Sequence, residues 1–139
     1  MTAEEYLDQV KKLDHQISVQ LDVLSSLRDM ALKVTSVMQE DVVSRTRDPH
    51  QFDGIMAKIV DLEKEIDAIV DELVDHKRDV ARLILKIEDP QIQDVLHLYY
   101  IGYRSWKEIA DMKHISKRTV YRCRDAGLKR IEELLSETT

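Results

Sequence analysis

Residues 55–87 read IMAKIVDLEKEIDAIVDELVDHKRDVARLILKI. Within this stretch ten residues follow one another in alternating steps of four and three positions, which places them on one face of a helix. They are Ile55, Ile59, Leu62, Ile66, Ile69, Leu73, His76, Val80, Leu83 and Ile87. Nine of these ten side chains are aliphatic, and the residues between them are rich in Asp, Glu and Lys. This period predicts a long amphipathic helix that packs against another helix along one seam. We interpret His76 as a polar residue that sets the register of that seam, not as a metal ligand.

Upstream of this stretch, a first long helix is predicted from Thr2 to about Glu40. It opens with Thr2-x-x-Glu5, the spacing of a capping box. Its apolar stripe is broad, as in a straight helix, and comprises Leu7, Val10, Ile17, Leu21, Leu24, Ala31 and Met38. Residues 44–50 are the predicted break, in which Asp48 can cap the next helix and Pro49 can occupy its first position.

Two long amphipathic helices joined by a short break predict an antiparallel helical hairpin over residues 1–88. A lone hairpin leaves apolar surface exposed, so it either pairs with a second copy or folds onto the rest of the chain. We expect a homo-oligomer, most simply a dimer, that forms through the hairpin. Partner binding is the other role that this segment could have.

The composition agrees with an all-α fold. Of the 139 residues, 35% are charged and 5% aromatic, and the chain has 3 Gly and 2 Pro. This composition favours long, solvated helices over β-sandwiches, barrels and Gly-rich nucleotide-binding folds. No apolar run approaches the length of a membrane span, and the first residues are acidic, unlike a secretory signal. We therefore expect a cytoplasmic protein with no membrane partner.

The helices after residue 88 are predicted from local signals. Asp89-Pro90 is a cap followed by a proline and begins a third helix, for which Gly102 is the expected left-handed stop. Ser105-x-x-Glu108 begins a short helix that ends at the turn 113–115. Ser116 then caps a final helix that runs to about Leu135. Two helices separated by a three-residue turn predict a helix-turn-helix domain over residues 89–139.

The final helix has two distinct faces. With Val120 in the core, the same side carries Cys123, Gly127, Ile131 and Leu134. The opposite side carries the candidate DNA-binding residues, which are Arg118, Tyr121, Arg122, Asp125 and Lys129, with Lys117 at its edge. Arginine can contact guanine edges or phosphate in the major groove, and tyrosine can contact the backbone. Arg104, Lys107 and Lys113 are candidates for phosphate contacts that orient this helix.

The net charge of −6 conceals an uneven distribution. Residues 1–89 hold 12 Lys and Arg against 20 Asp and Glu, whereas residues 104–130 hold 9 against 3. The second segment thus carries a balance of +6 on an acidic chain. Because nucleic-acid contact depends on local potential, this basic block favours duplex DNA as the partner.

Residues 95–122, VLHLYYIGYRSWKEIADMKHISKRTVYR, resemble the promoter-binding fourth region of sigma factors. Together with Leu62, Ile66, Ile69, Leu73, Asp89-Pro90, Tyr100-Ile101 and Ser105-Trp106, the chain more closely resembles small phage-encoded regulators of the ArpU/RinA type, including phage proteins of unknown function. This resemblance covers roughly residues 55–135. It implies control of phage gene transcription in a bacterial host, with a DNA-facing helix from Ser116 to Lys129 and host RNA polymerase as a further partner.

The sequence departs from that pattern at the turn. His114 stands where the family usually has glycine, and Lys113 replaces the apolar residue that often precedes it. We expect His114 to adopt the left-handed conformation at a cost of about 1 kcal/mol.

Two other functions are compatible with the same residues. One is a helical DNA-packaging or assembly factor similar to a small terminase subunit, and the other is an interaction protein whose helix-turn-helix no longer binds DNA. The sequence contains no Ser/His/Asp, Cys/His or Gly-rich phosphate-binding arrangement and a single cysteine. We therefore expect no enzyme activity, no cofactor and no metal.

Overall fold

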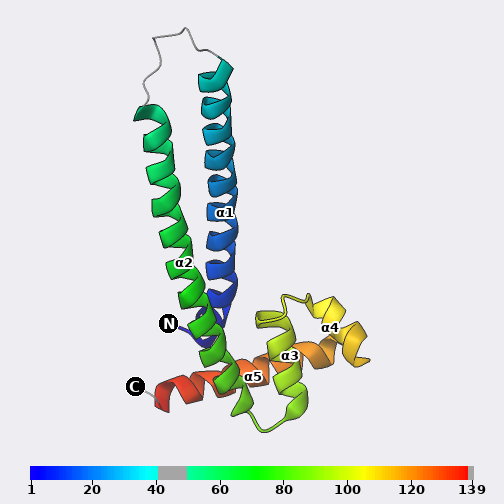
Figure 1. The fold of residues 1–139 in the computed structure, drawn as a ribbon. Coiled ribbons are helices and arrows are strands. Elements are labelled where there is room, and N and C mark those ends of the chain that lie inside the picture. The colour runs from blue at the N-terminus through cyan, green and yellow to red at the C-terminus, as the bar shows by residue number, and fades with distance from the viewer. Residues whose placement is uncertain (41–49, 138–139) are drawn as a thin grey trace. The chain divides into compact units, whose positions relative to one another are not determined.

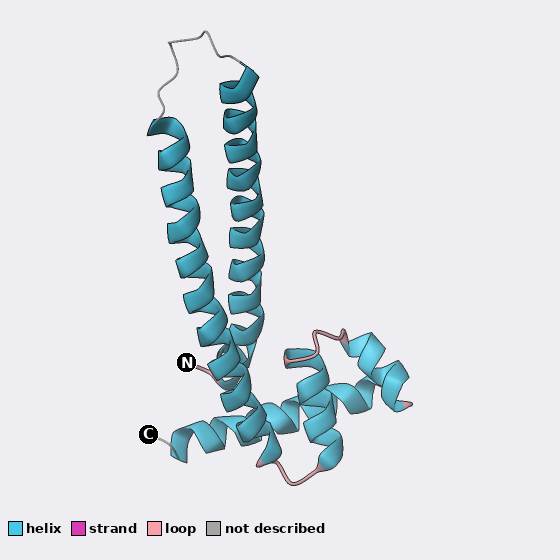
Figure 2. Ribbon diagram, viewed as in Figure 1, coloured by secondary structure: helices cyan, strands magenta, loops and turns pink. Residues whose placement is uncertain are grey.

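The computed structural model describes residues 1–40 and 50–137, without the side chains of residues 38–40. This part of the chain contains five helices and no strand: α1 (Ala3–Glu40), α2 (His50–Leu85), α3 (Pro90–Tyr100), α4 (Trp106–Lys113) and α5 (Lys117–Glu137) (Figures 1 and 2). The prediction of an all-α chain is confirmed. The predicted break covers residues 44–50. Its last residue, His50, begins α2, and Asp48 and Pro49 lie outside the described residues. Over the described ranges, no helix is both long and apolar enough to cross a membrane.

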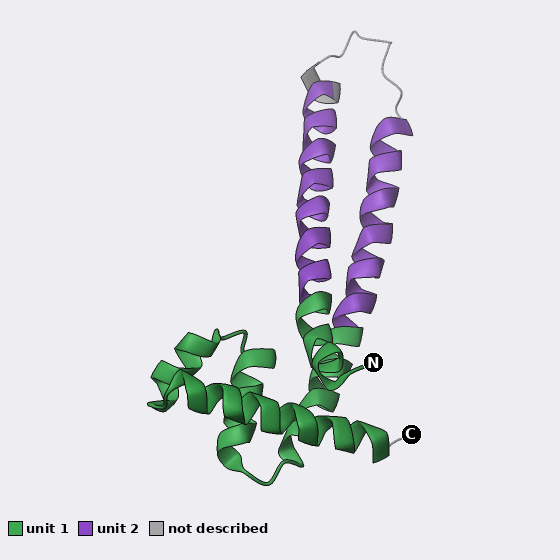
Figure 3. Ribbon diagram, turned by 180° about the vertical axis from the view of Figure 1, so that it is seen from behind, with its two compact units in different colours: residues 1–13, 72–139 green, residues 14–71 purple. Residues whose placement is uncertain are grey.

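The chain divides into two compact units, which are described separately (Figure 3). One consists of residues 14–71 and the other of residues 1–13 together with 72–139. The two ends of the long helices, residues 1–13 and 72–88, thus belong to the same unit as residues 89–139. The functional division at residues 88 and 89 stays a prediction.

In the unit of residues 14–71, the α1 and α2 segments lie side by side and run in opposite directions (Figure 3). Its core residues come from both helices and are Leu24, Ala31, Ile55, Ile59 and Ile66. Arg28 Nη2 lies 3.1 Å from Glu63 Oε1 and joins the two helices at their surface. This packing follows from the four-and-three period of the seam. Nine of its ten positions lie in α2 and the tenth, Ile87, lies just after it, and all ten are buried or half-buried.

The apolar stripe of α1 differs from the prediction at Leu21, which is 48% exposed. Leu24 is buried, and Leu27 and Val34 are half-buried against α2. Because α2 packs over the side of the stripe that carries Leu27 and Val34, Leu21 on the opposite edge remains in solvent. The prediction that Leu21 belongs to the buried stripe is therefore wrong.

In the unit of residues 1–13 and 72–139, α3, α4 and α5 share a core formed by Val95, Ile109, Ala110, Val120 and Cys123. Leu7, Val10 and Val80 of the same unit have no exposed surface. His76 is half-buried, and its Nε2 lies 2.7 Å from the carbonyl oxygen of Tyr6, to which it donates. A hydrogen bond to one backbone carbonyl suits the interpretation that His76 sets a register.

Several helix ends are as predicted. The Thr2 hydroxyl accepts from the Glu5 N–H at 3.2 Å, and the Glu5 carboxylate accepts from the Thr2 N–H at 3.2 Å. Asp89 caps α3 by accepting from the Gln91 N–H at 2.9 Å, with proline at the first helical position. α2 is shorter than predicted: it ends at Leu85, and the buried Ile87 follows in the connecting turn.

The end of α3 differs from the prediction. No glycine in the described residues has a positive φ, and the left-handed residue is Tyr103, at φ 58°. Gly102 is needed for space instead, because a Cβ at this position would lie 2.8 Å from the Leu98 carbonyl oxygen. Gly102 N–H donates to the His97 carbonyl at 2.8 Å and Arg104 N–H to the Leu98 carbonyl at 2.9 Å. The chain therefore reverses one residue later than predicted.

Candidate nucleic-acid interface

Local capping fixes where α4 ends and α5 begins. The Ser105 hydroxyl accepts from the Glu108 N–H at 3.1 Å at the start of α4. His114 ends α4 in the left-handed conformation, with φ 55° and ψ 44°, as predicted from its place in the turn. The Ser116 hydroxyl accepts from the Thr119 N–H at 3.1 Å and so caps α5. Three residues, 114–116, thus connect the two helices.

The buried face of α5 is the predicted one. It consists of Val120, Cys123, Gly127, Ile131 and Leu134. Gly127 is required by α3, because a Cβ here would lie 2.6 Å from Leu96 Cδ1 and 3.0 Å from Ile92 Cγ2. Close packing against α3 therefore sets the rotation of α5 and determines which side chains point outward.

The outward face of α5 forms a shallow hollow. Its lining residues are Arg118, Tyr121, Arg122, Asp125, Ala126 and Lys129, which include all five residues predicted for this side. Lys117, the first residue of α5, is exposed beside it. In the described part of the chain no carboxylate pairs with Lys117, Arg118, Arg122 or Lys129, whereas Arg124 and Arg130 of the same helix are paired. The hollow thus combines unpaired cations with one acidic side chain.

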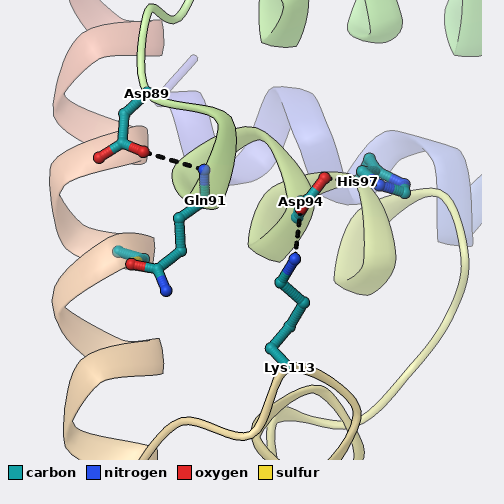
Figure 4. Close-up of polar contacts among 6 residues, drawn as sticks. Asp89, Gln91, Asp94, His97 and Lys113 are labelled. Atoms are coloured by element: carbon teal, nitrogen blue, oxygen red, sulfur yellow. Dashed lines mark hydrogen bonds and ion pairs between the residues drawn. The ribbon is translucent and has the colours of Figure 1, made fainter.

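The three side chains predicted to contact phosphate, Arg104, Lys107 and Lys113, differ in whether a carboxylate of the described chain pairs with them. Lys113 Nζ lies 2.5 Å from Asp94 Oδ2, so this ammonium is bound to α3 (Figure 4). That hydrogen bond is the largest cause that holds the pKa of the Asp94 carboxyl below its usual range, with His97 adding to it. Arg104 Nη1 lies 3.5 Å from Glu108 Oε2. Lys107 is exposed and has no ion pair within the described ranges.

Arg124 was not among the predicted site residues, because a helical wheel places it at the edge between the two faces of α5. Its side chain is 33% exposed, and it lies beside the hollow without lining it. Its Nε donates to Asp125 Oδ1 at 3.0 Å, and its guanidinium carbon lies 5.0 Å from the centre of the Tyr121 ring. Arg124 directly precedes Asp125, the one carboxylate that lines the hollow, and this adjacency is the signal available in the sequence.

Arg124 also contacts an aromatic column. Its guanidinium carbon lies 5.7 Å from the centre of the Trp106 ring, and Trp106 stacks on Tyr99 at 3.7 Å with 6° between the planes. Lys11 Nζ lies 3.5 Å from the centre of the Tyr99 ring. We call Lys11, Tyr99, Trp106 and Arg124 the stacked column. Trp106 packs within this stacked column and against the core shared by α3, α4 and α5, so its role is to support the fold.

Cys123, the single cysteine, lies in the core shared by α3, α4 and α5. Cys123 is buried, and burial raises the pKa of its thiol, which disfavours the reactive thiolate. Its Sγ lies 3.8 Å from Gln91 Oε1. Among the described residues, no group of three or more His, Cys, Asp or Glu side chains could hold a metal ion.

These features define an all-helical protein whose last helix exposes a basic hollow. Residues 32–132 match a family described as a protein of unknown function (DUF1492), and the chain belongs to this family. No curated protein and no solved structure matches the chain.

Proposed function

We propose that this protein is a phage-type, sequence-specific regulator of transcription that inserts α5 into the major groove of duplex DNA. The observation that carries the proposal is the set of outward cations on α5 that no carboxylate of the described chain neutralises. On a chain with more acidic than basic residues, cations left in one shallow hollow indicate a surface that is complementary to an anion.

The three-residue connection between α4 and α5 supports the prediction of a helix-turn-helix motif. Such a motif presents the N-terminal part of its second helix to the base edges while the first helix crosses the backbone. Lys117, Arg118 and Arg122 lie on the first two turns of α5, where this geometry needs donors. Arginine binds guanine O6 and N7 in a bidentate manner, and Tyr121 can contact the sugar-phosphate backbone. Lys107 is the best candidate for a separate phosphate contact.

The acidic part of the chain supports specificity. Residues 1–89 carry a balance of −8 and residues 104–130 one of +6. Repulsion between the acidic segment and DNA should weaken non-specific binding, which depends on phosphate contacts alone. The preference for the cognate site over random DNA then depends on base contacts made by α5.

The long helices support dimerisation as the role of the hairpin. In the unit of residues 14–71, large apolar side chains remain exposed on both helices, among them Val19, Val23, Leu32, Met56 and Val60. In a dimer, such side chains would pack against the hairpin of the second copy. Helix-turn-helix proteins commonly bind as dimers to two half-sites. The sigma-like and ArpU/RinA-like resemblance adds host RNA polymerase as a further proposed partner.

Recovery of bound DNA from an infected or lysogenic bacterial host tests the proposal. A regulator should enrich fragments that contain promoters, and purified protein should shift those fragments as a dimer. Enrichment of a single packaging site by a ring-shaped oligomer would favour the packaging factor instead. No enrichment, with no binding to duplex DNA at low salt, would favour an interaction protein and contradict our proposal.

A further inference from the structure

Asp125 is the one carboxylate among the residues that line the hollow of α5. A carboxylate there repels phosphate, so a surface that only attracted the DNA backbone would be better without it. A carboxylate is useful where the ligand presents an N–H donor. In the major groove such donors are the exocyclic amines of cytosine and adenine.

The geometry of Asp125 leaves one carboxylate oxygen available. Arg122 and Lys129 lie three residues before and four residues after it, which are the spacings at which helical side chains pair. Its ion pair is nevertheless with Arg124, whose Nε and Nη2 lie 3.0 and 2.9 Å from the same atom, Oδ1. No hydrogen bond to Oδ2 is found in the described part of the chain, and the Asp125 side chain is 67% exposed.

Arg124 is itself held in place by its surroundings. Its side chain is 33% exposed, and its guanidinium lies beside the rings of Tyr121 and Trp106. Trp106 is stacked on Tyr99 in the stacked column. A guanidinium restrained in this way can orient the carboxylate before DNA binds, which reduces the entropy lost on binding.

We propose that Asp125, oriented by Arg124, accepts a hydrogen bond from the N4 amine of a cytosine and so selects a C·G pair at one position of the DNA site. This inference rests on the proposed function. Cytosine suits the carboxylate better than adenine, because adenine places the acceptor N7 beside its N6 amine. Arg124 acts as a positioning residue, since it contacts the carboxylate and not the base.

Selection from randomised duplexes, followed by titration of single base-pair variants, tests the inference. The wild-type protein should select cytosine at one position and bind the three other pairs there about tenfold more weakly. Asp125→Ala should lose this discrimination at that position alone. Asp125→Asn should shift the preference toward adenine, because an amide pairs with N6 and N7 together.

The role of Arg124 is tested in the same assay. Arg124→Gln should reduce the discrimination at the cytosine position, and Arg124→Lys, which keeps a cation beside Oδ1, should restore part of it. Glu133→Ala is the matched control, because it removes a carboxylate that is ion-paired with Arg130 on the same helix. This control should leave the selected sequence unchanged.

The outcomes separate this inference from the function on which it rests. If the wild-type protein selects no sequence, the proposed function fails and the inference fails with it. If the wild-type protein selects a sequence and Asp125→Ala keeps the same preference at every position, the inference alone is overturned. A wild-type preference for adenine that Asp125→Ala abolishes would also overturn the assignment to cytosine.

Discussion

Gly127 of α5 faces Leu96 of α3 so closely that a Cβ on the glycine would lie 2.6 Å from Leu96 Cδ1. Leu96 has no exposed surface and cannot move into solvent. The absence of one side chain therefore lets α5 pack against α3 and sets which of its residues face outward.

Alanine substitutions at two glycines that both lie within helices should have opposite effects on stability, because only one of the two, Gly127, makes this contact. Gly127→Ala should lower the free energy of unfolding by about 1 kcal/mol, because overpacking outweighs the gain in helix propensity. Gly54→Ala should raise it by up to about 1 kcal/mol, because a Cβ there meets nothing within 4 Å. Denaturant unfolding followed by circular dichroism measures both. Equal stabilisation by the two substitutions would show that α3 and α5 are not in this contact.

The N-terminal residues should stabilise the unit that contains α5. Leu7→Ala should cost about 3 kcal/mol, because this side chain is fully buried in that unit. Trp106, the single tryptophan, lies in the same unit and reports its unfolding by fluorescence. Lys12→Ala is the control: Lys12 is on the same helix but exposed, so its removal should change the stability by less than about 0.5 kcal/mol. If the two variants unfold alike in fluorescence, the assignment of residues 1–13 to this unit is wrong.

The ion pair between Asp94 and Lys113 should make a small, pH-dependent contribution to stability. The folded-state pKa of Asp94 is lowered, chiefly by its hydrogen bond with Lys113, so the stabilisation is fully present above the ordinary aspartate value of about 4. It is lost as the pH falls through the lower folded-state pKa. Because both side chains are about one-third exposed, we expect at most about 1 kcal/mol between wild type and Asp94→Asn at pH 6. Unfolding curves should show this difference shrinking toward pH 2, and a constant difference would argue against the ion pair.

The same ion pair predicts different roles for two lysines in DNA binding. Lys107 has no ion pair within the described ranges, whereas Lys113 is bound to Asp94. Lys107→Ala should reduce the slope of log affinity against log salt by about 1, the effect of one lost phosphate contact. Lys113→Ala should change it less, because that lysine must first leave Asp94. Affinities of both variants across a series of salt concentrations decide this, and a larger effect of Lys113→Ala would reverse our assignment.

Local signals in the sequence predict much of the fold. The four-and-three period identifies the seam of α2, and the caps at Thr2, Asp89, Ser105 and Ser116 lie where short-range hydrogen bonding places them. The left-handed conformation of His114 follows from its position in the turn. These features depend on neighbours within a few residues, which the sequence displays directly.

Features that depend on contacts between residues far apart in the sequence cannot be predicted from such local signals. Local signals also do not decide whether Gly102 or Tyr103 is the left-handed residue after α3, and in the structure it is Tyr103. The role of Arg124 depends on Trp106, which comes from another helix. The partition of the chain into units depends on residues 1–13 meeting residues 72–139, a contact between segments far apart in sequence.

An equilibrium titration of a selected duplex tests the central claim, that the outward face of α5 reads DNA. Arg118→Ala/Arg122→Ala should reduce specific affinity to the level of a scrambled duplex while helicity is unchanged. Arg78→Ala/Arg82→Ala is the matched control, because it removes two exposed arginines from α2 and changes the net charge equally. We predict that this control binds within about threefold of wild type. Specific binding that survives the Arg118→Ala/Arg122→Ala change would contradict the account.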